Sequence, residues 1–372
     1  MISNGHMVAE LLNASASGIA AMAADKLVNE RAAVRSEHRA DAVRTWRECV
    51  SSRLPFLAAA VSTACPRVFV EQARWAHTAY ASRGGEPAAL AFSASLECMR
   101  DVICEQLPPE AARLAATYVD HAIDSIRVSP PNPAPPMDAS TRIGRLISRY
   151  LAAVLEGDRR AAAMLILDAA RGDDGSAALP VRSLLLDVLV PAQIELGRMW
   201  HLNEATVAEE HFATATTQMV VSQLFSMLRF SPRNGLVAVA ASVEGNAHDV
   251  GVRVLADLLE AEGWRVVYLG ASVPAEDLAQ AVDMFEADLL CVSAGLGSQL
   301  PAVARTIEAV RAAGRGRQVK IMVGGGGFAG TCESEADPLW RRFGADGFAA
   351  NIDDGLRIAG QLCPAAKKTG RD

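Results

Sequence analysis

Apolar residues recur along the first third of the chain at the spacing of amphipathic helices. Residues 1–128 carry them at intervals of three and four, and runs of Val, Ile and Thr are missing. The clearest helical segments are 67–82, 87–105 and 109–127. Pro108 and Pro109 stand at the start of the last segment, where a helix tolerates proline. The pattern predicts an all-α N-terminal domain over residues 1–128.

A proline-rich segment ends this domain, and a second helical part follows it. Five of the eight residues 129–136 are proline, which excludes a helix interior and predicts a semi-rigid linker. Beyond it, residues 137–232 show helical spacing in four segments separated by short polar loops. These segments are 141–156, 159–171, 180–201 and 205–229. Helices with such short connections are typical of an antiparallel four-helix bundle.

The pattern changes after residue 232, where buried-strand runs alternate with amphipathic helices. The expected strands are 236–243, 265–269, 289–293, 319–323 and 347–350. The expected helices are 251–263, 274–286, 300–313, 337–343 and 353–362. Repeated βα units predict a five-stranded parallel sheet with helices on both faces, a Rossmann-like (flavodoxin-like) α/β domain over residues 233–372. In such a sheet, ligands bind at the carboxyl ends of the strands.

Composition and charge exclude several classes of protein. With 51% hydrophobic residues, the chain is not intrinsically disordered as a whole. Its 36 Lys and Arg against 43 Asp and Glu argue against a general nucleic-acid-binding surface. No apolar run reaches the ~18 residues of a membrane span, and the nearest, 184–196, contains Asp187 and Glu195. We find no export signal and no close pair among the seven cysteines, so we expect a cytoplasmic protein with reduced thiols and no membrane partner.

Three loops at one edge of the predicted sheet carry candidate binding residues. The loop after the first strand contains Asn246, His248, Asp249 and Gly251. A histidine just past a strand end faces the ligand crevice, and a glycine opening the next helix lets a bulky ligand come close. The third strand ends in Ser293, and the fourth runs into Gly324 and Gly325. A solvent-facing loop is the plainer interpretation of the histidine alone, but the common edge favours a ligand site.

This arrangement resembles the cobalamin-binding domain that methionine synthase, corrinoid methyltransfer proteins and CarH-type photoreceptors share. Its three-part signature is matched by His248 with Gly251, by Ser293, and by Gly324 with Gly325. The resemblance implies that His248 is the lower axial ligand of cobalt. It also implies that the nucleotide tail of the cofactor runs into the sheet past the serine and the glycines.

Two positions depart from the signature. Asn246 stands where a carboxylate is usual, and Gly295 stands where a leucine is usual. Asparagine can accept the histidine's hydrogen bond but brings no charge, so we expect histidine ligation to survive with a weaker bond to cobalt. Gly295 is expected to leave the tail pocket looser.

A second motif lies in the predicted bundle. Trp200 and His201 end one helix, and Glu210 and His211 fall in the next, with nine residues between the tryptophan and the glutamate. A core tryptophan with polar partners at helix ends is the plainer interpretation. Before a cobalamin-binding domain, however, this W-x9-E-H pattern resembles the cap of CarH-type photoreceptors, and the resemblance covers residues 140–363. It implies that Trp200, Glu210 and His211 cover the adenosyl group of adenosylcobalamin, and that His201 takes the cobalt once that group has left.

Three roles therefore compete for the protein, none of them that of an enzyme. A light-sensing photoreceptor would bind adenosylcobalamin and change its bundle packing and assembly when light breaks the cobalt–carbon bond. A corrinoid methyl carrier would need an open upper face, against which the aromatic and carboxylate lid argues. A light-independent regulator that senses cobalamin supply is the third, while a radical mutase subunit would need a substrate barrel that the sequence does not show.

The N-terminal helical domain has no predicted wing strands and no basic recognition helix, so we expect no direct DNA binding. One interpretation is a domain for homo-oligomer assembly or for signalling to an unknown effector protein or enzyme domain, and the other is a second ligand pocket. A helical domain before a cap and a cobalamin-binding domain resembles the photocobilins, which pair cobalamin with biliverdin. One predicted helix offers a candidate wall for biliverdin, although its residues are spread around the helix. These residues are Phe69, Arg74, Trp75, His77 and Tyr80.

Overall fold

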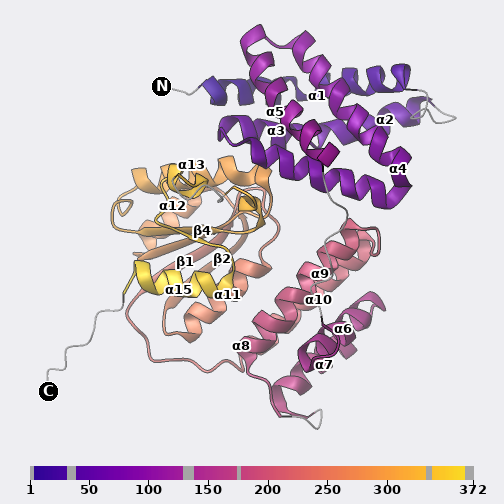
Figure 1. Ribbon diagram of the computed structural model, residues 1–372. Coiled ribbons are helices and arrows are strands. Elements are labelled where there is room, and N and C mark those ends of the chain that lie inside the picture. The colour runs from indigo at the N-terminus through magenta and orange to yellow at the C-terminus, as the bar shows by residue number, and fades with distance from the viewer. Residues whose placement is uncertain (1–3, 32–38, 129–137, 174–176, 332–336, 365–372) are drawn as a thin grey trace.

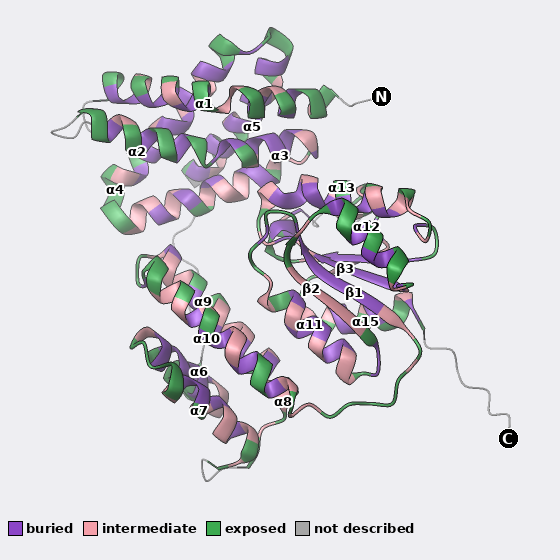
Figure 2. Ribbon diagram, turned by 180° about the vertical axis from the view of Figure 1, so that it is seen from behind, coloured by how far each residue is buried: buried purple, intermediate pink, exposed green. Residues whose placement is uncertain are grey.

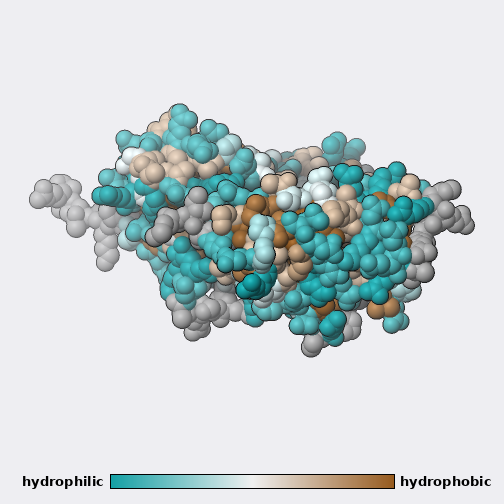
Figure 3. All heavy atoms as spheres, turned by 90° about the horizontal axis from the view of Figure 1, so that it is seen from above, coloured by the Kyte–Doolittle hydropathy of each residue, from teal (hydrophilic) through white to brown (hydrophobic). Residues whose placement is uncertain are grey.

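A computed structural model describes residues 4–31, 39–128, 138–173, 177–331 and 337–364 of the chain. The expected proline-rich linker, 129–136, and Cys332 lie outside these residues. The chain folds into a helical N-terminal part, a helical bundle and a C-terminal sheet domain, which lie side by side (Figure 1). Seen from above, the molecule is largely hydrophilic, and apolar residues gather near the centre of that face (Figure 3).

The described N-terminal residues are helical, as the pattern predicts. The helices are α1 (Asn4–Glu30), α2 (Arg39–Ser51), α3 (Leu54–Ser62), α4 (Pro66–Gln106) and α5 (Pro109–Val128). The segments 67–82 and 87–105, expected as separate helices, are two arms of α4. They meet at a kink, because Gly85 has φ 66° and ψ −161° and Pro87 follows it.

Helix α1 is, by length and composition alone, long enough and apolar enough to cross a membrane. The expectation that no apolar stretch is long enough to span a membrane was therefore wrong for this helix. The inspection of apolar runs missed α1 because alanine, serine and glycine separate its larger apolar residues. In the structure Leu12, Ile19 and Leu27 of α1 are fully buried in the N-terminal core.

The middle part is the expected four-helix bundle. Its helices are α6 (Arg142–Leu155), α7 (Arg159–Arg171), a long third helix made of α8 (Val181–Ser183), η2 (Leu184–Leu189) and α9 (Val190–His201), and α10 (Val207–Phe225). The polar loops between them supply N-caps: the side chains of Thr141 and Asp158 accept from backbone N–H groups, and Thr206 forms a capping box with Glu209.

The C-terminal domain is a five-stranded parallel sheet in the order β2-β1-β3-β4-β5, which confirms the predicted fold class. The strands are β1 (Val237–Val243), β2 (Arg265–Val273), β3 (Leu289–Ser293), β4 (Lys320–Gly324) and β5 (Gly347–Ala349). The main helices are α11 (Val250–Ala261), α12 (Ala275–Met284), α13 (Leu300–Ala312) and α15 (Ile352–Leu362). Strands β1 and β3 lie buried between these helices, whereas β2, at one edge of the sheet, is only partly buried (Figure 2).

The two faces of the sheet belong to two different hydrophobic cores. Side chains alternate along a strand, so Val239 and Ala241 of β1 face one way and Ala238 and Ala240 the other. The first pair joins a core that includes α12, α13 and the N-terminal helices. The second pair joins the core of α11, α15 and the bundle. Both helical parts of the chain therefore pack on the sheet domain, one on each side.

Candidate functional site

The candidate loops leave the sheet where its strand order reverses. The chain passes from β1 outward to β2 and returns to β3 on the other side of β1, which makes a crevice between the ends of β1 and β3. Ser242 of β1 pairs in register with Ser293 of β3, and Ser293 pairs with Gly324 of β4. The three loops singled out in the sequence therefore start side by side at one edge.

Asn246 organises the loop that carries His248. It is fully buried, and its Oδ1 accepts from the backbone N–H of His248 at 3.0 Å. Its Nδ2 donates to the carbonyl of Ser293 at 3.1 Å, which ties the loop to the end of β3. The ring Nδ1 of His248 lies 3.3 Å from the same Oδ1. When Nδ1–H donates to Asn246, the exposed imidazole keeps a lone pair on Nε2 for a metal.

Gly295 lies directly beneath this histidine. A Cβ at position 295 would be 2.8 Å from Oδ1 of Asn246 and 2.9 Å from Nδ1 of His248. Contacts that short are not tolerated, so the space a side chain would fill is taken by the imidazole and its hydrogen-bond partner. Gly295 is not among the residues that line the cavity described below, and its effect on a tail pocket stays a prediction.

Asp249 connects the loop to two other elements. Its carboxylate accepts from the hydroxyl of Tyr268 on β2 at 2.6 Å and from Nε2 of Gln218 on α10 at 3.0 Å. Burial and the hydrogen bond to Asp249 raise the pKa of Tyr268, so the phenol stays a donor. One helical turn further on, Arg253 donates to the hydroxyl of Ser222 on α10 at 2.7 Å. These contacts fix the bundle over the loop.

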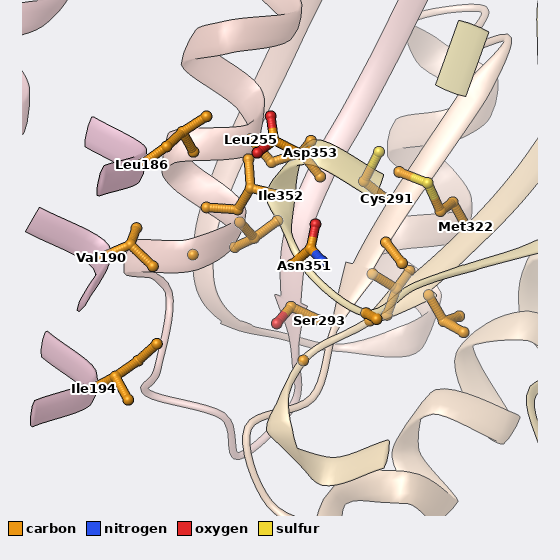
Figure 4. A pocket seen from close by; sticks show the side chains of 18 residues that line it. Leu186, Val190, Ile194, Leu255, Cys291, Ser293, Met322, Asn351, Ile352 and Asp353 are labelled. Carbon is orange, nitrogen blue, oxygen red and sulfur yellow. The ribbon is translucent and has the colours of Figure 1, made fainter. Parts of the chain in front are cut away.

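A cavity of about 310 Å³ opens beside the loop, between the bundle and the C-terminal domain. Four of the proposed binding residues line it: Gly251, Ser293, Gly324 and Gly325. A Cβ at Gly251 would meet nothing within 4 Å, so this glycine widens the cavity. Figure 4 shows side chains of the bundle reaching toward the ends of the strands from across the cavity.

Gly324 and Gly325 are also required by the backbone around them. A Cβ at Gly324 would lie 2.8 Å from the carbonyl oxygen of Ala349 on β5. Gly325 has φ 97°, and a Cβ there would lie 2.3 Å from the carbonyl oxygen of Ala294. The glycines thus let the neighbouring strands and loops approach closely, in addition to lining the cavity.

Sequence reasoning missed most of the apolar lining of this cavity. The missed residues are Leu186, Val190, Ile194, Val252, Leu255, Cys291, Val292, Met322, Val323, Ala349, Ala350, Asn351, Ile352 and Asp353. Two signals were available. Cys291 and Met322 stand two positions before Ser293 and Gly324, so period-two alternation points them to the same face. Asn351 is the N-cap of α15, and its Oδ1 accepts from the backbone N–H of Asp354 at 2.8 Å.

The cap motif, Trp200 with His201 and Glu210 with His211, lies on α9 and α10, two helices that also carry residues near the crevice. Val190 and Ile194 of α9 line the cavity, and His201 lies seven residues after Ile194, on the same face. On α10, Glu210 lies eight residues before Gln218 and shares its face. Oε2 of Glu210 is 2.5 Å from Nδ1 of His211. In the described part of the chain, no hydrogen bond or ring contact joins Trp200, His201, Glu210 or His211 to His248.

Trp200 and His201 instead contact the N-terminal domain. The ring of Trp75 on α4 stacks on Trp200 at 5.3 Å and on His201 at 4.5 Å between centroids. Nε2 of His201 lies 2.8 Å from the carbonyl oxygen of Trp75. Arg83 donates to the carbonyls of Trp200 and His201 at 2.9 and 3.1 Å, and Ser82 donates to that of His201. Burial, together with the nearby Arg83, lowers the pKa of His201.

Phe69, His77 and Tyr80 face the N-terminal core, and Phe69 is fully buried there, whereas Arg74 pairs with Glu71. Tyr80 stacks on Trp46, and both Tyr80 and His77 contact Phe92. The guanidinium of Arg53, which is only 5% exposed, lies 4.7 Å from the ring centroid of Phe92 and 5.5 Å from that of Tyr80.

Comparisons with known proteins agree with this geometry. Two family models match the chain, both described as a B12 binding domain, one over residues 236–339 and one over residues 146–224. The first covers the sheet with its candidate loops, and the second covers most of the bundle. Two B12 binding domains imply a cobalamin or corrinoid cofactor.

Several curated proteins are similar over about a third of the chain. Dimethylamine corrinoid protein 3 of Methanosarcina mazei is 30% identical over 126 residues, which are 34% of this chain and 71% of that protein. Dimethylamine corrinoid protein 1 of Methanosarcina acetivorans is 30% identical over 126 residues, 34% of this chain and 56% of that protein. The HTH-type transcriptional repressor CarH of Myxococcus xanthus is 36% identical over 125 residues, 32% of this chain and 40% of the repressor.

The match thus spans about half the length of the relatives from Methanosarcina acetivorans and Myxococcus xanthus. Among solved structures, the Methanosarcina barkeri monomethylamine corrinoid protein aligns with 59% of this chain and 99% of its own, with 17% identity and a TM-score of 0.48. The two domain models and the extent of the match to the Methanosarcina mazei protein show the family. This chain belongs to the family of B12-binding proteins.

Proposed function

We propose that this protein is a photoreceptor that binds adenosylcobalamin and passes a light signal from its bundle to its N-terminal domain. What carries the proposal is the position of the cap motif. It continues the face of α9 that lines the cavity, and it ends in a stacked contact with the N-terminal domain. Residues that contact the N-terminal domain from a helix that also lines the cavity are suited to link a change at the cofactor to a change in domain packing.

The residues at the crevice fit a corrinoid bound through a protein histidine. His248 offers an exposed imidazole at the rim, and the cavity beside it has room at Gly251, where a Cβ would meet no atom within 4 Å. We infer that His248 is the lower ligand of cobalt and that Asn246 holds its Nδ1 proton. Ser293, Gly324 and Gly325 then lie along the nucleotide tail, and Asp249 keeps the loop in place through Tyr268 and Gln218.

The cap residues are assigned to the upper side of the cofactor. When bound, adenosylcobalamin supplies a cobalt–carbon bond that visible light breaks. Trp200, Glu210 and His211 cover the adenosyl group in this proposal, with an aromatic face and polar atoms suited to a nucleoside. His201, which now contacts Trp75, would be the residue to hold the cobalt once the adenosyl group is lost, and giving up that contact would let the bundle shift against α4.

The signal therefore ends in a change of assembly in the cytoplasm. The N-terminal domain, released from α9, alters its contact with a second copy of the chain or with an effector protein. No direct DNA binding and no catalysis by the chain itself are part of this proposal.

Similarity to the Methanosarcina corrinoid proteins supports an alternative role, that of a methyl carrier. Such a carrier, or a regulator that senses cobalamin supply, binds a corrinoid but has no use for a light-dependent contact between α9 and α4. Size and absorption separate these roles. The full-length protein is loaded with adenosylcobalamin in the dark, and its absorption spectrum and molar mass are measured before and after green light. We expect light to change both the absorption spectrum and the molar mass of a photoreceptor. An unchanged molar mass after complete photolysis would reject the light-sensing role.

We also propose biliverdin as a second chromophore, held without a covalent bond in the N-terminal domain. Arg53 supports this: its guanidinium is buried against Phe92 and Tyr80, and its Nε has no hydrogen-bond partner among the described residues. A propionate of biliverdin would satisfy that donor. Titration of biliverdin into the full-length protein should give a red-absorbing band that Arg53→Gln weakens and that Arg47→Gln, on the exposed side of α2, leaves unchanged. A red-absorbing band of equal strength in Arg53→Gln and the parent protein would reject this assignment, and so would the absence of a band.

A further inference from the structure

The cavity beside His248 has an unusually uniform inner end. Ser293 and Gly324 are paired at the ends of β3 and β4, and Cys291 and Met322 are paired two residues earlier. Two residues of strand correspond to about 7 Å, so the two sulfur-containing side chains lie well inside the edge of the sheet. Their exposed fractions are 2% and 1%. Together with Leu255 of α11, they form what we call the sulfur floor of the cavity.

The polar side chains that line the cavity lie at its mouth. They are Ser293 at the end of β3 and Asn351 and Asp353 at the start of α15. Asn351 is already engaged, because its Oδ1 accepts from the backbone N–H of Asp354 and its Nδ2 donates to the carboxylate of Asp354 at 3.2 Å. A ligand group that reaches the sulfur floor therefore meets thiol, thioether and aliphatic carbon.

The sulfur floor stays uncharged at any physiological pH. Burial raises the pKa of the Cys291 thiol to about 12, so the thiolate is not available there as a strong acceptor. Thiols and thioethers hydrogen-bond weakly but contact aromatic rings favourably, and methionine adapts its shape to the ring it meets.

We propose that this cavity selects corrinoids whose nucleotide tail ends in an apolar benzimidazole base over those whose tail ends in a purine. The proposal rests on the proposed binding mode, in which His248 takes the cobalt and the tail enters the cavity. A purine such as adenine carries ring nitrogens and an exocyclic amine, which lose their water on the sulfur floor and find no strong partner. A dimethylbenzimidazole presents methyl groups and ring edges to Cys291 and Met322 instead.

Three corrinoids test this in the dark with the full-length protein. They are cobalamin, the corresponding cobamide with adenine as its base, and cobinamide, which has no nucleotide tail. Dissociation constants are measured by absorbance titration. We expect cobalamin to bind about 10- to 100-fold more tightly than the adenine cobamide, because one or more polar atoms of the purine stay unpaired.

Substitutions in the sulfur floor locate the selectivity. Met322→Gln places an amide of similar length at the inner end and should narrow the preference for cobalamin at least several-fold. Met322→Leu keeps the floor apolar and should keep the preference. Met284→Gln makes the same chemical change at a side chain that is 64% exposed on α12 and serves as the matched control. The parent protein and the three variants should bind cobinamide with the same affinity, because cobinamide has no tail that reaches the sulfur floor. Equal cobinamide affinities also show that the variants are folded.

The outcomes separate this inference from the function on which it rests. Equal affinities for cobalamin and the adenine cobamide, or a preference that Met322→Gln leaves intact, would overturn the selectivity while cobalamin binding stands. Met322→Gln could also lower the affinities for cobinamide and for cobalamin by the same factor. That result would overturn the selectivity, because cobinamide has no tail that could meet Met322. A full-length protein that binds neither cobalamin nor cobinamide would reject the proposed function itself.

Discussion

The imidazole of His201 lies flat on the indole of Trp75, with ring centroids 4.5 Å apart and planes 8° from parallel. The two residues are far apart in the sequence and belong to different parts of the molecule, the end of α9 and the first arm of α4. Arg83 reinforces the contact, because its guanidinium donates to the last carbonyls of α9 and lies 5.6 Å from the ring centroid of Trp200. The contact makes α4 the partner of the cap.

Replacing Trp75 should separate the cap from the N-terminal domain without disturbing the cofactor site. Trp75→Leu removes both ring contacts, which are worth about 1 kcal/mol each beyond the area they bury. We expect holoprotein carrying Trp75→Leu to photolyse at the normal rate but to lose the light-dependent change in assembly, followed by size-exclusion chromatography with light scattering. Trp75→Phe, which keeps an aromatic face, is the control and should respond to light. A normal change in assembly in Trp75→Leu would contradict this route.

Acid should weaken the same contact. Burial lowers the pKa of His201 below its ordinary value of 6.5 in the folded chain, so the unfolded chain binds the proton more readily. The stability contributed by neutral His201 is therefore complete above pH 6.5 and is lost as the pH falls through the lower pKa of the folded state. Thermal unfolding of the full-length protein between pH 7.5 and pH 5 should show this loss, and His201→Gln should flatten it. A pH profile that His201→Gln leaves unchanged would assign the loss to other groups.

Trp200 should be needed for the response to light. In the proposed arrangement, Trp200→Ala uncovers the adenosyl group and also removes the stack on Trp75. We expect about 5- to 10-fold weaker binding of adenosylcobalamin relative to cobalamin without the adenosyl group, and no change in assembly under light. Trp340→Ala, at a tryptophan of the sheet domain that does not line the cavity, is the comparison. A structure of the loaded protein with Trp200 remote from the adenosyl group would end this assignment.

His248 should determine how cobalt is held. His248→Ala removes the imidazole that faces the crevice, so we expect at least about 10-fold weaker cobalamin binding and a spectrum in which the cofactor keeps its own base. His121→Ala changes an exposed histidine on α5 and should bind cobalamin like the parent protein. Equal spectra and affinities for His248→Ala and the parent would show that another residue takes the cobalt.

Much of the fold follows from local patterns, because residues that favour turns mark the ends of the strands and helices of the C-terminal domain. The glycines at 263 and 325 have positive φ and end a helix and a strand. The edge that gathers His248, Ser293 and Gly324 follows from parallel topology alone. The break within α4 follows as well, since Gly85 and Pro87 ordinarily end a helix, and Gly85 has non-helical φ and ψ here.

The contacts between domains could not be predicted from the sequence. Trp75 looks like one aromatic residue among several on an amphipathic helix, and nothing near it in the sequence marks Trp200 as its partner. The same is true of Ile194, which reaches the cavity only because the bundle lies on the sheet domain. Such contacts depend on how the folded domains pack against one another. The spacing of apolar residues within a short segment of sequence carries no information on that packing.

Adding even a methyl group at position 295 should disturb the loop. Gly295→Ala places a Cβ within 2.9 Å of both Oδ1 of Asn246 and Nδ1 of His248, so the imidazole must move. We expect Gly295→Ala to weaken cobalamin binding about 10-fold, with Gly360→Ala on α15, where a Cβ meets nothing within 4 Å, as the control. Combined with Asn246→Asp, the effect should not be additive, because both changes act on the same hydrogen bond. Additive losses would show that the two positions are independent.

For protein engineering, positions 246, 248 and 295 are best treated as one unit. A Cβ at position 295 would meet both Oδ1 of Asn246 and Nδ1 of His248, so a side chain introduced there changes the surroundings of the other two residues at the same time. A library that varies the three positions together should therefore contain folded, cobalamin-binding combinations that single exchanges do not reach.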